Sequence, residues 1–179
     1  AAAQHDEKIV DKIKQQLMDG KNVVVTSGLF QALQDRGLTD IVEVEVTDRK
    51  ALVKEFRIGW NQVASSSSDI LMPHLRYFTN DSWEIISGFT ETTGHPLLHM
   101  ADYAGGRLYI LTMPDNFNDL YRLPSEVLAH IRSVLLQDLP VRLEGPAKVA
   151  LFVYDNDTAI MESFLSEPVA VTLIVGDNV

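Results

Sequence analysis

The sequence predicts an α/β fold with a β-rich C-terminal portion, and two observations carry this prediction. Residues 22–26 are mostly β-branched, which favours an extended backbone, and Ser27-Gly28 and the helix-like stretch LFQALQD follow at once. We expect Gly28 to take a positive φ where the chain turns sharply from strand to helix. A strand, a tight turn and a helix in this order form the first half of a βα unit. In such folds ligands and catalytic groups sit just beyond the carboxyl end of the strand.

The second observation is a change of sequence pattern at Pro140 and Gly145-Pro146. Beyond it come three β-rich segments with turn-forming residues between them, at residues 148–154, 158–164 and 169–175. We therefore expect two regions, residues 1–139 and residues 140–179. Because a piece of about 40 residues with three strands rarely stands alone, this tail should pack on the first region, with strands from residues 41–58.

The remaining elements of the first region follow from the spacing of apolar residues. Helical spacing predicts helices at residues 6–19 and 125–137. Alternating or continuous apolar runs predict strands at residues 41–47, 51–58, 83–89, 95–101 and 107–112, with turns at residues 48–50 and 103–106. Residues 61–69 contain four consecutive serines and read as a flexible surface loop.

The strand at residues 22–26 has no strand before it that could be its parallel neighbour. We therefore expect either that residues 1–139 are the C-terminal half of a larger domain or that the sheet has an unusual strand order.

The composition excludes several classes of function. A net charge of −10 and a pI near 4.8 argue against binding to nucleic acid or to an anionic membrane surface, because both need clustered Lys and Arg. The absence of cysteine excludes disulfides, thiolate ligands and a cysteine nucleophile, and it leaves the cellular compartment open. No apolar run approaches the length of a membrane span, and the first residues lack the features of a signal peptide.

Ser27 occupies the position that a nucleophile takes at a strand-to-helix elbow. There the side chain stands on a strained turn, with backbone N–H groups behind it as an oxyanion hole. The elbow pattern needs small residues on both sides, and the β-branched Val25 stands two positions before Ser27. The favoured interpretation is therefore an inert helix entry with Ser27 as a cap. The alternative is a serine hydrolase that uses Ser27 with a histidine such as His99 as the base.

Two histidines are candidates for a metal site. His95 and His99 lie on one face of the expected strand and could bind zinc together with Asp102. Four residues of extended chain separate them by about 13 Å, which is too far for one ion. We therefore expect no metal and no cofactor.

Polar and aromatic residues give a second class of candidate site. Asp115 and Asn116 follow a strand and could hold a polar ligand, although turn formation also explains them. Trp60 and Trp83 could stack on a sugar ring through their faces, although such residues more often belong to the core.

Three segments carry a resemblance to a known family. The order of a helix, the strand NVVVTSG, a second helix, the hairpin GGRLYILTMPDN and a final helix resembles the C-terminal half of a class I glutamine-amidotransferase-like domain, which has a flavodoxin-like fold. Versions of that fold accompany bacterial glycoside hydrolases, often followed by a β-sandwich. The segment VRLEGPAKVALFVYDNDTAIMESF is similar to such trailing segments.

The departures from that family limit what the resemblance implies. Active members carry a cysteine inside a G-x-C-x-G elbow, with a His and a Glu downstream, whereas here the elbow reads Val25-Thr26-Ser27-Gly28-Leu29. The resemblance thus implies a non-catalytic accessory or oligomerisation module of a larger carbohydrate-processing protein. Its partners would be other domains of that protein or further copies of the chain. A serine hydrolase and a carbohydrate-binding module remain the alternatives.

Overall fold

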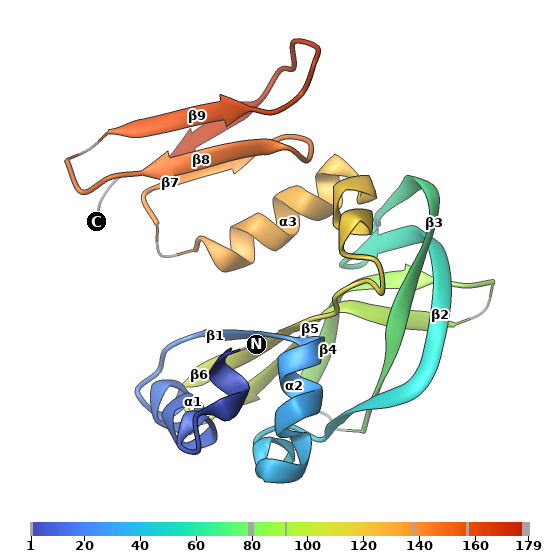
Figure 1. Ribbon diagram of the computed structural model, residues 1–179, viewed down its shortest axis with the longest axis vertical. Coiled ribbons are helices and arrows are strands. Elements are labelled where there is room, and N and C mark those ends of the chain that lie inside the picture. The colour runs from blue at the N-terminus through green and yellow to red at the C-terminus, as the bar shows by residue number, and fades with distance from the viewer. Residues whose placement is uncertain (1, 79–80, 92, 138, 157, 177–179) are drawn as a thin grey trace.

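The computed structural model describes residues 2–78, 81–91, 93–137, 139–156 and 158–176 (Figure 1). Its α-helices are α1 (Ile9–Met18), α2 (Ser27–Leu33) and α3 (Ser125–Leu135). Short 3₁₀ helices are η1 (Ala2–His5), η2 (Gln34–Arg36), η3 (Leu38–Asp40) and η4 (Phe117–Arg122). The strands of the first region are β1 (Val23–Thr26), β2 (Val44–Ile58), β3 (Gln62–Tyr77), β4 (Ser82–Phe89), β5 (Gly94–Tyr103) and β6 (Gly106–Leu111). The tail contains β7 (Val141–Glu144), β8 (Val149–Val153), β9 (Ala159–Ser163) and β10 (Thr172–Val175).

A six-stranded mixed sheet forms the centre of the fold, in the order β1-β6-β5-β4-β2-β3. β1 runs parallel to β6, and the other described pairs of this sheet are antiparallel. The parallel neighbour of β1 therefore follows it in the chain by more than 80 positions, with Val25 opposite Ile110. The α/β class and the β-rich C-terminal portion are confirmed.

Helices cover both faces of the sheet. α1 and α2 lie on one side and α3 lies on the other (Figure 1). The apolar stripe of α1 and Phe30 of α2 pack with residues such as Leu108 and Ile110, whereas Val127 and Ile131 of α3 pack with Tyr109 and Phe56. Residues 108–110 alternate between the two cores because successive side chains of a strand point to opposite faces. Among the described residues, no helix is both long and apolar enough to cross a lipid bilayer.

Two polar segments that the sequence predicts as a loop and a turn belong to β-strands in the structure. The serine run lies in β3, where Ser65 pairs with Glu55. The buried hydroxyl of Ser66 donates to the Ser68 carbonyl at 2.6 Å, and the Lys54 carbonyl is also within reach at 3.2 Å. The expected loop at residues 61–69 is therefore wrong, because pairing with β2 outweighs the low strand propensity of serine. The expected turn at residues 48–50 is also wrong, since β2 continues through it.

A bulge explains the polar signal in β2. Val46 pairs with Leu75 and Lys50 with Pro73, so β2 gains two residues on its partner between these points. Such an insertion bends the strand and leaves residues without a ladder partner, which polar side chains tolerate. β2 and β3 are strongly curved (Figure 1).

The turn into α2 differs from the expectation in one respect. Gly28 is helical and is not among the residues with positive φ. The N-cap is Thr26, whose hydroxyl accepts a hydrogen bond from the backbone N–H of Leu29 at 3.3 Å. The cap satisfies a free helix-terminal donor, and the extended backbone of Thr26 leads directly into the helix, so the turn needs no positive φ.

The tail forms two small antiparallel sheets, β7 with β10 and β8 with β9. The sequence predicts packing of this tail with strands from residues 41–58. Among the described residues, its main contact is instead β7 against α3, which in turn contacts β2. The Arg132 guanidinium of α3 donates to the carbonyls of Gly145 and Pro146, at 2.6 and 3.1 Å.

Candidate functional site

The hydroxyl of Ser27 at the elbow is buried and already forms a hydrogen bond within the fold. Ser27 is 2% exposed, and its Oγ accepts a hydrogen bond from the backbone N–H of Met113 at 3.0 Å. Met113 lies just beyond β6, the parallel neighbour of β1. This bond therefore ties the start of α2 to the end of the adjacent strand, in the place where an active enzyme would present a nucleophile.

His99, the candidate base, lies in a separate environment. It is fully buried in β5, and both of its ring nitrogens lack a hydrogen-bond partner. Its ring packs against that of Tyr77 in a tilted arrangement, with 4.5 Å between the ring centroids. Burial lowers the pKa of His99 to about 4, so the imidazole is neutral near neutral pH. Ser27 and His99 are not hydrogen-bonded to each other.

A partly buried polar network lies beside His99. The hydroxyl of Tyr77 donates to the Glu84 carboxylate at 2.8 Å, and the hydroxyl of Ser87 donates to the same carboxylate. Burial raises the pKa of Tyr77 to about 12, and the bond to Glu84 adds to this shift. Tyr77 thus stays protonated near neutral pH, and its hydrogen bond to Glu84 orients the ring against which His99 packs.

The three candidate metal ligands are not assembled. His95 faces His74 of β3, with 5.5 Å between the ring centroids, and Asp102 pairs with Arg107 at 3.3 Å. His99 lies against Tyr77, as described above. Within the described part of the chain, no group of three His, Asp or Glu side chains is arranged to hold a metal ion.

Asp115 and Asn116 are both engaged within the chain. The Asp115 carboxylate forms an ion pair with Lys50 of β2, and its backbone N–H donates to the Leu71 carbonyl. The Asn116 side chain accepts from the backbone N–H of Asn118 at 3.1 Å and caps η4. These contacts are the turn chemistry that the sequence also allowed. A ligand at this position stays a prediction.

The structure brings Trp60 and Trp83 to one groove. It has a volume of about 650 Å³, and apolar surface predominates in its lining. Trp60 is 95% exposed at the tip of the β2–β3 hairpin, and Trp83 of β4 is 44% exposed. Polar side chains stand among the aromatic ones, namely Arg57, Gln62, Glu84 and His130. The last comes from α3, and no sequence signal placed it near the tryptophans.

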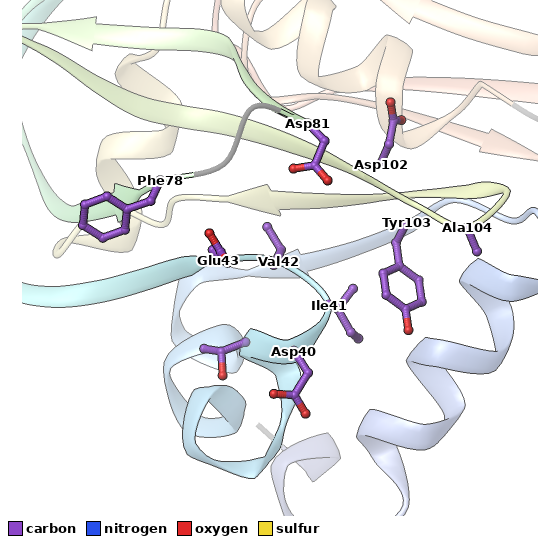
Figure 2. Close-up of a pocket in the computed structure, with 10 residues that line it drawn as sticks. Asp40, Ile41, Val42, Glu43, Phe78, Asp81, Asp102, Tyr103 and Ala104 are labelled. Atoms are coloured by element: carbon purple, nitrogen blue, oxygen red, sulfur yellow. The ribbon is translucent and has the colours of Figure 1, made fainter.

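A larger and more acidic hollow lies at the other end of the sheet. It measures about 910 Å³, and its lining includes four carboxylate side chains: Asp40, Glu43, Asp81 and Asp102. Figure 2 shows that these come from the segment before β2 and from the ends of β4 and β5, and that Asp102 and Tyr103 point to opposite sides of β5. Sequence reasoning did not find this hollow, because its residues lie far apart in the chain and follow no motif.

Two family models match the chain, and the one that covers residues 2–116 spans more than half of it. The family model described as "Uncharacterized protein SSO3021, second domain" matches residues 2–116, and the one described as "Probable glycosyl hydrolase, C-terminal domain" matches residues 140–179. No curated protein matches the chain in sequence.

Solved structures share the fold. Cytoplasmic Protein STM1381 from Salmonella typhimurium LT2 is 14% identical with a TM-score of 0.52, over 73% of this chain and 60% of that protein. The β-galactosidase from Bacillus circulans sp. alkalophilus is 12% identical with a TM-score of 0.51, over 80% and 22%. Gan42B, a GH42 β-galactosidase from G. stearothermophilus, is 12% identical with a TM-score of 0.52, over 95% and 28%.

The chain therefore spans between 22% and 60% of the length of these three proteins. At such low identities the likeness concerns the fold alone. It confirms the expected resemblance to an α/β domain that accompanies glycoside hydrolases.

Proposed function

We propose that this chain, which belongs to the family described as the second domain of uncharacterized protein SSO3021, is a non-catalytic accessory or oligomerisation module of a larger carbohydrate-processing protein. The fold it shares with parts of β-galactosidases and the match of its tail to a glycosyl hydrolase C-terminal domain support the setting. The observation that carries the non-catalytic role is the state of Ser27. Its hydroxyl is buried and accepts the Met113 N–H, so the elbow joins two elements of the fold.

The surface of the tail supports contact with other domains or other copies of the chain. Large apolar side chains of the β8–β9 sheet and the turn after it are exposed: Phe152, Tyr154, Ile160, Met161, Phe164 and Leu165. Small two-stranded sheets are marginally stable by themselves, and exposed apolar side chains on such a sheet favour contact with another protein surface. We propose residues 1–139 and 140–179 as the two units of the module.

The purified chain is expected to turn over no ester or amide substrate. A fluorophosphonate that labels active serines should leave Ser27 unmodified by mass spectrometry, because the hydroxyl is inaccessible and has no imidazole bonded to it. Ser27→Ala is the control, since any signal that it fails to abolish has another origin. Turnover or labelling that disappears in Ser27→Ala would establish the serine hydrolase in place of the accessory role.

Carbohydrate binding is the second candidate function, and the groove that contains both tryptophans favours it. Indole faces can stack on the apolar face of a sugar ring, while neighbouring polar groups can hydrogen-bond its hydroxyls. Arg57 and Gln62 lie at the same groove as Trp60, so both kinds of contact are present. Such an exposed tryptophan at a hairpin tip is also costly to leave in water.

Tryptophan fluorescence tests this site directly. The chain has two tryptophans, both at this groove, so the entire tryptophan signal reports on it. Titration with galacto-oligosaccharides should give a saturable spectral shift. Trp60→Ala should weaken binding about tenfold, because one aromatic stacking contact is lost. Phe164→Ala removes another exposed aromatic ring, one that lies in the tail, and should change nothing. An unchanged spectrum across the titration would remove this function.

A further inference from the structure

The bulge in β2 lies beside a small pocket whose lining has an unusual charge. The pocket has a volume of about 410 Å³, and its polar lining residues are Arg49, Lys50, His74, Thr90, Thr93 and His95. The chain has 25 acidic residues against 15 Lys and Arg, yet no acidic side chain is among the residues that line this pocket. The local surface thus has the opposite character to the protein as a whole.

The pocket contains a buried polar atom without a partner. His95 is 9% exposed, and its Nδ1 has no hydrogen-bond partner in the described part of the chain. Its Nε2 lies 3.4 Å from the Thr90 hydroxyl. The bulge residue Thr47 contacts Nδ1 of His74 at 3.1 Å, and the rings of His74 and His95 meet edge to face. Buried polar atoms are nearly always satisfied, so an orphan at a pocket indicates a missing partner.

The neighbouring charges favour an anion as that partner. Among the described residues the Arg49 guanidinium has no ion pair, whereas Lys50 is already paired with Asp115. The pKa of His95 is lowered by burial and next by the charge of His74, while Glu84 acts in the opposite direction. An anion in the pocket would favour the charged form of His95 and give the Arg49 fork a ligand of matching geometry.

We propose that this pocket binds a small oxyanion, a phosphate or carboxylate group, with Arg49 supplying the charge and His95 and the threonine hydroxyls supplying hydrogen bonds. A β-bulge suits such a site, because it re-aims side chains out of the regular pleat. The proposal concerns a surface separate from Ser27 and from the tryptophan groove. It stands or fails independently of the proposed function.

Histidine ring signals in nuclear magnetic resonance spectra test the proposal. The 179-residue chain is titrated at neutral pH with inorganic phosphate and, separately, with acetate, each against sodium chloride at constant ionic strength. The signals of His74 and His95 should shift and saturate with at least one of the two anions, while those of His5 and His130 stay in place. Bound anion should also raise the pKa of His95.

Two charge variants make the result specific. Arg49→Gln should weaken the binding at least about tenfold, because a charge-assisted hydrogen bond is lost. Lys54→Gln removes one positive charge from an exposed position of the same strand and should leave the affinity unchanged. Linear shifts of all the histidines, no shift at all with either anion, or equal affinity in Arg49→Gln would each overturn the proposal.

Discussion

Gly106→Ala is expected to lower the free energy of unfolding by about 3 kcal/mol. A Cβ at this position would lie 2.8 Å from the Leu17 carbonyl oxygen and 2.9 Å from the Leu17 Cα, and it would also clash with the Lys21 carbonyl. All of these are backbone atoms, which cannot rotate away. The end of α1 and the start of β6 would therefore have to separate. Urea denaturation followed by circular dichroism measures the change.

Gly28→Ala is the matched control for this prediction. A Cβ on Gly28 would meet no atom within 4 Å, and the residue is helical at the start of α2. The substitution should leave stability unchanged or raise it by about 0.5–1 kcal/mol, because alanine loses less backbone entropy than glycine in a helix. A Gly106→Ala chain as stable as Gly28→Ala would mean that α1 does not pack on β6 as described.

His99→Leu is expected to remove the loss of folding stability at acid pH that the buried His99 causes. The pKa of His99 is lowered to about 4 by burial, against an ordinary value of 6.5. Above pH 6.5 the imidazole is neutral in both states and contributes no pH dependence. Between pH 6.5 and about 4 the unfolded chain binds the proton and the folded chain does not, so stability falls as the pH falls. Below about pH 4 the loss is complete, at about 3 kcal/mol.

Leucine has no proton to bind and no unpaired nitrogen to bury, so the variant should be at least as stable as the parent near neutral pH. Its advantage should grow by about 3 kcal/mol as the pH falls to about 4. Unfolding free energies measured across this pH range give the difference directly, and the other histidines cancel in it. His5→Leu makes the same change at an exposed histidine and is the matched control. The hypothesis fails if the His99→Leu and parent curves stay parallel.

Local sequence signals predicted the elements whose pattern is decided by their own residues. The stripe Val10, Ile13 and Leu17 is buried in α1 as its spacing requires, and the hairpin of β5 and β6 follows from its turn. The predictions were wrong where a partner far away in the sequence determines the secondary structure. The serine run lies in a strand whose Ser65 pairs with Glu55 of β2, and β2 passes through residues 48–50 because a bulge in the pairing accommodates the polar residues.

The candidate sites divide in the same way. Composition alone identified Trp60 and Trp83 as ligand-binding candidates, but their common groove depends on the neighbouring positions of β2 and β4 in the sheet. The pair of His74 and His95 was not predicted, because these residues come from strands that are not adjacent in the sheet. The bond from Met113 to Ser27 spans 86 residues, and no local pattern could reveal that the elbow hydroxyl is occupied.

The serine run affects how readily the central sheet could aggregate through its open edge. β3 is the outermost strand of the central sheet, with 16 residues and one edge free of a partner strand in the described chain. A long open edge of this kind is a template for fibril growth when its side chains are apolar and continuous. The exposed Ser65 and Ser67, with Pro73 further along the same strand, make this edge polar and hydrated. We therefore expect the serine run, a low-complexity segment in the sequence, to protect the sheet against aggregation.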